Sequence, residues 1–196
     1  MNTEEIFKKS GAILEGHFLL TSGLHSPIYW EKFRVLQSPS YTRQLCSLIS
    51  DRFKAENVDV VAGPTTGGII LAYEVAGQLG VRGIFAEKED TDHRIFKRGF
   101  GIKPGERVLI VDDILTTGKS IREVLSLVKE QSGEAIGIGV LVDRSEKMHD
   151  FGVPLFNCLR SITPTYEPQH CPLCAAGIPL VKPGSSQNPQ NKQPAG

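Results

Sequence analysis

The sequence predicts an α/β protein with a central, mainly parallel sheet flanked by helices and a small N-terminal hood. Continuous apolar segments, typical of strands buried on both faces, alternate with amphipathic segments of helical length. Polar and charged residues directly follow several of these segments, which is where such sheets bind ligands. The length of 196 residues suits one domain of this kind.

The first elements belong to the hood. Asn2 or Thr3 can cap a helix that we expect to continue to about Leu14. Residues 16–36, GHFLLTSGLHSPIYWEKFRVL, are rich in β-branched and aromatic residues and contain glycine and proline. This composition indicates a hairpin or hood and not a strand of the central sheet.

The core begins at Ser38, which with Pro39 is a good start for a helix. That helix carries an apolar stripe at Leu45, Leu48, Ile49 and Phe53. Two further helices are expected at 67–80 and 119–130. Strands are expected at 58–63, 82–87, 107–113, 136–144 and 153–159.

Composition limits the domain organisation and the class of function. We expect one domain over residues 1–182, with a hood of about 1–36 plus a C-terminal segment and a core of about 37–160. Residues 183–196 are polar and rich in proline and glycine, which predicts a disordered tail. Lys+Arg and Asp+Glu both total 22, a balance that argues against a nucleic-acid-binding surface.

The same composition bears on location. No apolar run approaches the roughly 18 residues of a membrane-spanning helix. The N-terminus is charged and lacks the apolar centre of a secretory signal. We therefore expect a cytoplasmic protein whose four cysteines are reduced.

The stretch VLIVDDILTTGKS (108–120) carries the strongest functional signal. An apolar strand ends on two acids, and a turn with Thr116, Thr117 and Gly118 leads into a helix. Backbone N–H groups at such a turn and helix start form an anion site, to which hydroxyl groups such as that of Ser120 can add donors.

Asp112 and Asp113 would repel a phosphate, so they must contact another part of the same ligand. Ionised carboxylates only accept hydrogen bonds, and the hydroxyls of a ribose can donate them. The ligand predicted is a ribose 5-phosphate. A nucleoside-triphosphate loop ending in GKS would need glycine at position 113, where this chain has aspartate. A structural helix cap beside a solvated turn is the alternative.

VLIVDDILTTG resembles the phosphoribosyl pyrophosphate (PRPP) signature of the type I phosphoribosyltransferase family, whose fold it implies. Three more segments resemble the orotate phosphoribosyltransferase branch of that family. They are GHFLLTSGLHSPIYWEKF in the hood, VDVVAGPTTGGIILA in the pyrophosphate loop and LVDRSE before the last strand. The resemblance covers about residues 10–182.

The resemblance implies transfer of 5-phosphoribose from PRPP to orotate, giving orotidine 5-phosphate and pyrophosphate in pyrimidine nucleotide biosynthesis. It implies Mg²⁺ as cofactor, carried mainly by PRPP, and no protein metal ligand is assigned. Catalysis is assigned to Lys88, His93 and Asp113, and orotate binding to Thr116 and Arg144. PRPP binding is assigned to Lys88, His93, Asp112, Asp113, Ile114, Leu115, Thr116, Thr117, Gly118, Lys119 and Ser120.

The resemblance also implies a homodimer in which loop 87–101, within a charged segment (85–106) expected to be a mobile loop, serves the neighbouring subunit. The chain departs from the family pattern at four cationic positions, now occupied by His25, Glu87, Thr91 and Gly67. Arg94, Lys97 and Arg98 could replace the lost loop cation. A transferase for another nucleobase and a non-catalytic PRPP-binding regulator remain alternatives. An ion pair of Arg144 with Asp143 or Glu146 is the structural alternative for that residue.

Cys171 and Cys174 form a C-x-x-C preceded by His170. A structural zinc site usually needs four ligands. Cys46 and Cys158 lie singly in apolar segments and are expected to be buried core residues. A zinc site shared across a dimer, a purely structural pair and a labile redox pair are the three interpretations.

Overall fold

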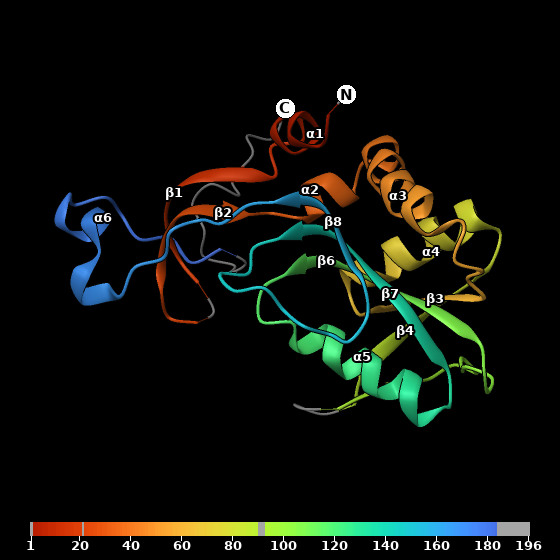
Figure 1. Ribbon diagram of the computed structural model, residues 1–196. Coiled ribbons are helices and arrows are strands. Elements are labelled where there is room, and N and C mark those ends of the chain that lie inside the picture. Colours follow the sequence, from red (N-terminus) through yellow and green to blue (C-terminus); the bar gives the residue numbers. More distant parts are fainter. Residues whose placement is uncertain (1, 21, 90–92, 184–196) are drawn as a thin grey trace.

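The computed structural model describes residues 2–20, 22–89 and 93–183 and confirms the α/β class (Figure 1). Six strands form one sheet in the order β5-β4-β3-β6-β7-β8. All neighbours are parallel except β4 and β5. The strands are β3 (Val60–Pro64), β4 (Arg82–Lys88), β5 (Arg94–Phe96), β6 (Arg107–Leu115), β7 (Glu134–Asp143) and β8 (Leu155–Arg160).

Helices cover both faces of this sheet, as Figure 1 shows. Helices α3 (Pro39–Phe53) and α4 (Gly67–Leu79) pack on one face, and α5 (Lys119–Glu130) packs on the other. Alternate residues of β6 divide between the two cores: Leu109 faces α3 and α4, and Ile110 faces α5. Burial on both faces explains the unbroken apolar run that marks this strand in the sequence.

The hood is a separate two-stranded sheet of β1 (Ile13–Leu19) and β2 (His25–Trp30), between α1 (Thr3–Lys9) and α2 (Phe33–Leu36). It confirms the hairpin expected over 16–36. Residues 164–183, here called the C-terminal strap, return to this hairpin and contain the 3₁₀ turn η1 (Pro168–His170) and α6 (Pro172–Ala175). Backbone hydrogen bonds join Val181 to His17 and Leu19, and Tyr166 to His25.

Two sequence expectations for the helices were wrong in detail. The first helix ends at Lys9 and not near Leu14, because Gly11 takes a left-handed φ of +66° and the chain enters β1 at Ile13. In α3, Leu48 lies outside the buried stripe and is 39% exposed. Asn2 caps α1 as expected, in a capping box with Glu5.

The charged segment 85–106 contains regular structure that its polarity concealed. Strands β4 and β5 form an antiparallel hairpin in which Lys88 pairs with Arg94. Expecting a loop throughout was therefore wrong, because backbone pairing needs no apolar side chains. The expected tail falls almost entirely on residues 184–196, outside the described residues. None of the helices in the described part of the chain is long and apolar enough to span a bilayer.

Candidate active site

The candidate site is a crevice at the carboxyl ends of β3 and β6. The chain adds β4 on one side of β3 and then crosses to add β6 on the other, so the strand order reverses between β3 and β6. These two strands pair only from Val60–Ala62 against Val108–Ile110, so they separate beyond that point. Ligands of open α/β sheets bind at such a switch point.

The two acids lie inside β6 and not at its end, because the strand continues to Leu115. Asp112 is 6% exposed and Asp113 is 3% exposed. Asp112 accepts a hydrogen bond of 2.7 Å from the Ser120 hydroxyl and one of 2.9 Å from the Asp113 N–H. The Ser120 hydroxyl, assigned to PRPP binding from the sequence, therefore donates to an acid of the site.

Lys32 faces Asp113 from the hood, immediately before α2. Its ammonium lies 2.8 Å from Oδ2 and donates a 3.0 Å hydrogen bond to Oδ1 of Asp113. Oδ2 accepts no well-aligned hydrogen bond, which leaves it able to accept one from a ligand. Sequence reasoning missed Lys32, since the two residues are 81 positions apart and the hood segment gave no periodic signal for it.

The acid pair has unusual electrostatics. Burial, and then the neighbouring Asp113 carboxylate, raise the pKa of Asp112 to about 7, while Ser120, the Asp113 N–H and Lys32 oppose the shift. A ligand that donates hydroxyl hydrogen bonds would favour the ionised form of Asp112. Binding and proton release are therefore linked at this site.

A glycine-rich loop lies against Asp113 from β3. A Cβ on Gly67 would lie 1.6 Å from Asp113 Oδ2, and one on Gly63 would lie 2.3 Å from the carbonyl oxygen of Gly68. Only glycine at position 67 lets the loop approach the acid so closely. This contact gives a physical reason for the absence of the family's lysine at that position. The Thr65–Thr66 peptide bond in the same loop is cis.

The turn after β6 exposes the hydroxyls expected to meet a phosphate. Thr116 and Thr117 are exposed, and Gly118 caps α5 with a φ of +75°. The Thr116 carbonyl oxygen accepts a 2.8 Å hydrogen bond from His149 Nε2, which ties the turn to the loop after β7. The exposed hydroxyls and the amino end of this 12-residue helix offer the donors that an anion site needs.

Arg144 follows β7 and is fixed by its backbone N–H, which donates a 2.8 Å hydrogen bond to the Leu115 carbonyl oxygen. Burial lowers the pKa of its guanidinium and Tyr29 opposes this shift. Its buried Nε has no hydrogen-bond partner, and no carboxylate of the described residues forms an ion pair with it. The ion pair considered with Asp143 or Glu146 is thus wrong, and the guanidinium is available for an anionic ligand.

The two residues assigned to catalysis on the β4–β5 hairpin, Lys88 and His93, differ in their distance from the turn that follows β6. His93 is exposed and lines a groove of about 750 Å³ together with Thr117 and Lys119. Lys88 is exposed at the end of β4, and its ammonium forms no ion pair or hydrogen bond within the described part of the chain. The structure thus brings His93, but not Lys88, to the turn that follows β6.

Two of the three cations considered as replacements for the missing loop lysine already pair with carboxylates of the chain. Arg94 is buried, forms a 2.7 Å ion pair with Glu123 and donates a 3.1 Å hydrogen bond to Thr65 Oγ1. Arg98 pairs with Glu87 at 2.9 Å, and Lys97 is exposed. Thr91 lies outside the described residues. Arg94 therefore fixes the loop after β3 through Thr65, while its charge is balanced by Glu123.

A switch-point crevice with buried acids, a glycine-rich loop and a hydroxyl-bearing turn at a helix start fits the phosphoribosyltransferase class. The family model "Phosphoribosyl transferase domain" matches residues 34–163. An orotate phosphoribosyltransferase of Caldanaerobacter subterraneus is 51% identical over 92% of this chain and 95% of its own length. That of Desulforamulus reducens is 49% identical over 95% and 99%.

A solved structure gives the same result. The crystal structure of orotate phosphoribosyltransferase from Aeropyrum pernix superimposes with a TM-score of 0.70 at 28% identity, covering 80% of this chain and 92% of that one. The chain belongs to the orotate phosphoribosyltransferase family. It is accordingly a transferase of the pentosyl-transferring type.

Proposed function

We propose that the protein transfers 5-phosphoribose from PRPP to N1 of orotate, releasing pyrophosphate and forming orotidine 5-phosphate. The observation that carries this proposal is the convergence of Asp112, Asp113 and Gly67 beside the turn at Thr116–Gly118. The carboxylates that would accept hydrogen bonds from a diol and the turn that would bind a phosphate thus lie next to each other, within a few residues along the chain. PRPP has both groups on one sugar.

In the proposed reaction the bond from ribose C1 to the pyrophosphate oxygen breaks and its electron pair leaves with pyrophosphate. Orotate N1 forms the new bond to C1 and releases its proton, which the departing pyrophosphate can accept, so no residue of the chain is assigned as general base. Asp113 and ionised Asp112 orient the sugar by accepting its hydroxyl hydrogen bonds. Thr116 and Thr117 hold the 5-phosphate, and the planar Arg144 guanidinium can pair with the orotate carboxylate through two parallel bonds.

Mg²⁺ suits this donor set, because the crevice offers the hard carboxylate oxygens of Asp112 and Asp113 and Oδ2 of Asp113 has unused acceptor capacity. We propose that it arrives with PRPP and that these acids add few ligands to it. When bound, the ion supplies charge neutralisation for the leaving pyrophosphate. Lys88 and His93 are proposed to add positive charge from the hairpin.

A homodimer is proposed as the working unit, with loop 87–101 serving the neighbouring subunit. Supporting this, Phe33, Ile70 and Tyr73 are 42%, 36% and 80% exposed, and they line adjoining grooves on α2 and α4. Such an apolar surface is typical of a protein contact. We place the reaction in the cytoplasm, since PRPP is multiply charged and orotate carries a carboxylate, so neither crosses a bilayer unaided.

The test is pyrophosphate release from PRPP and Mg²⁺ with orotate, adenine, hypoxanthine or uracil. We expect release with orotate alone. Arg144→Lys keeps the charge but loses the forked donor, so the KM for orotate should rise about ten- to hundredfold while the KM for PRPP changes little. Release with another base would favour that base. PRPP binding without release for any base would favour a regulator.

A further inference from the structure

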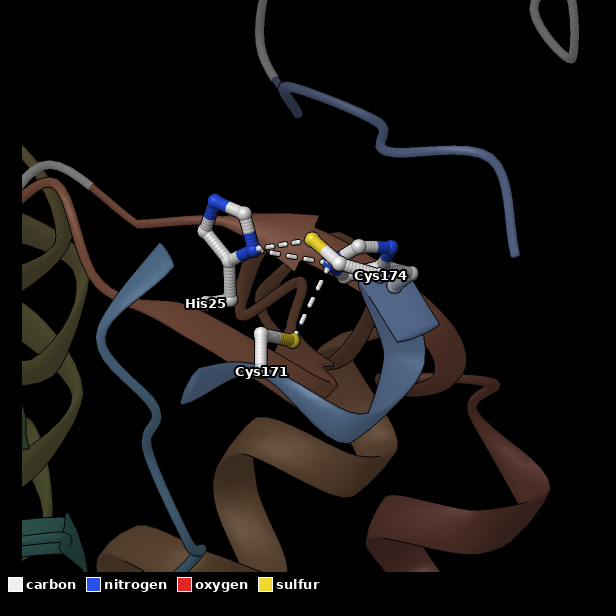
Figure 2. Close-up of side chains that lie close together, drawn as sticks. His25, Cys171 and Cys174 are labelled. Carbon is white, nitrogen blue, oxygen red and sulfur yellow. Dashed lines mark hydrogen bonds between the residues drawn. The ribbon is translucent and has the colours of Figure 1, made fainter. Parts of the chain in front are cut away.

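Four side chains with metal-binding atoms converge far from the crevice, where the C-terminal strap meets the hood. They are His17 on β1, His25 at the start of β2, Cys171 before α6 and Cys174 within it. Their ligand atoms all lie within 4.8 Å of one another. Figure 2 shows the Cys174 sulfur directed toward the His25 ring, with the Cys171 sulfur close by in the same cluster.

The spacing of these atoms fits a tetrahedron. Zinc bonds of about 2.0–2.1 Å to nitrogen and 2.3 Å to sulfur give edges of about 3.3 Å between nitrogens and about 3.5 Å between nitrogen and sulfur. His17 Nε2 lies 2.9 Å from His25 Nδ1 and 3.5 Å from Cys171 Sγ. Cys174 Sγ lies 3.7 Å from His17 Nε2 and 3.3 Å from His25 Nδ1. A single ion at the centre accounts for all four separations.

The surroundings hold one ligand in the orientation that a metal requires. His17 Nδ1 lies 2.7 Å from the Ile178 carbonyl oxygen, which can only accept, so Nδ1 carries the proton and Nε2 presents its lone pair to the cluster. His17, His25 and Cys171 are 2%, 5% and 4% exposed. A ring-to-ring hydrogen bond would explain the nitrogen pair but gives no reason for two sulfurs beside the same nitrogens.

Apart from the backbone hydrogen bonds of Val181 and Tyr166 to the hood, little holds the strap in place. Among residues 164–183, Cys171 is the only one that is buried. A segment with so little apolar burial gains almost nothing from the hydrophobic effect, and a structural metal is a common substitute in such cases. Four ligands from one chain also leave no open coordination position, as expected for a structural and not a catalytic zinc.

We propose that His17, His25, Cys171 and Cys174 bind one Zn²⁺ per chain and fasten the strap to the hood. The zinc interpretation drawn from the C-x-x-C expected ligands from a second subunit; the missing pair is instead the two hood histidines of the same chain. His25 occupies the position of a family lysine in the hood. Zinc binding would explain why this chain has a histidine there. The proposal does not depend on the base that the enzyme uses.

The first test measures zinc in the full-length protein, made without a metal-affinity tag or chelator in zinc-supplemented medium. We expect about one zinc per chain, and a loss of about tenfold or more in Cys174→Ser. Cys158→Ala removes a thiol outside the cluster, and His170→Gln removes an exposed histidine one residue from Cys171; both should keep the zinc. A zinc-free wild type, or zinc retained in Cys174→Ser, would overturn the proposal.

A second measurement stands even if Cys174→Ser fails to fold. Wild-type protein loaded with Co²⁺ should show the intense visible bands of a tetrahedral ion and thiolate charge-transfer absorption. Weak octahedral bands, or no uptake, would contradict the site. A Cys171–Cys174 disulfide in freshly purified protein, seen as the loss of two hydrogens by mass spectrometry, would overturn it in favour of a redox pair.

The fastening role has its own readout. Chelation should make residues 164–183 sensitive to limited proteolysis, and added zinc should restore resistance. A strap equally resistant with and without zinc would show that the metal does not hold it.

Discussion

Replacing Lys32 with methionine tests whether the hood completes the acid site. The change removes the ammonium but keeps an unbranched apolar side chain of similar length. In the wild type this ammonium lies 2.8 Å from Oδ2 of Asp113, whose side chain is 4% exposed. Without it, Asp113 is a buried charge beside a second buried acid, Asp112.

The structure sets the size of the effect. Breaking a fully buried ion pair costs about 3–5 kcal/mol, and a hydrogen bond to a charged group contributes about 1.5–3 kcal/mol. The Lys32 side chain is 36% exposed, so solvent screens the pair. The range for a hydrogen bond to a charged group therefore applies, and not the range for a fully buried ion pair. We therefore expect Lys32→Met to lower the free energy of unfolding by about 2 kcal/mol near pH 7.5. In an Asp113→Asn background the same change should cost about 0.5 kcal/mol or less.

The assay is urea unfolding followed by circular dichroism, at one fixed protomer concentration because a dimer's stability depends on it. Wild type, Lys32→Met, Asp113→Asn and the double variant form a double-mutant cycle, which gives the coupling energy between the two side chains directly. Lys97→Met, which removes an exposed lysine of the hairpin, is the matched control and should change stability by less than about 0.5 kcal/mol. Equal costs of Lys32→Met in both backgrounds would refute the ion pair as the source of the effect.

Two further predictions concern the same crevice. Gly67→Ala should lower kcat/KM for pyrophosphate release about a hundredfold or more, because the Cβ of the alanine cannot coexist with Asp113 in this position. The control is Gly77→Ala on the same helix, which has open space around its Cβ and should retain activity. A fully active Gly67→Ala would contradict the close approach of Gly67 to Asp113. Because the folded pKa of Asp112 is raised from 3.8 to about 7, the native state holds a proton that the unfolded chain has released between about pH 4 and 7. The free energy of unfolding should fall with rising pH across that window and less so in Asp112→Asn; parallel pH profiles from urea unfolding would exclude Asp112 as the group responsible.

Local patterns predicted the central part of the molecule well. The helix expected at 119–130 is α5 with the same bounds, and the helix expected at 67–80 ends one residue earlier, at its Gly80 cap. Both carry an apolar face and a clear boundary residue, so neighbours along the chain specify them. The predictions for the first helix and for the 85–106 segment were less accurate, since short apolar or charged runs do not distinguish a helix from a strand or a loop.

By itself the sequence determined most strands and helices of the core, the acid pair and the turn after it, because each depends on residues within about a dozen positions of one another. Only the tertiary structure decided which distant residues meet them: Lys32 at Asp113, and His17 with Cys171, 154 positions apart. Such contacts are fixed by how the hood and strap pack against each other and the sheet. No local periodicity records that packing, so these partners became visible only when the chain was folded.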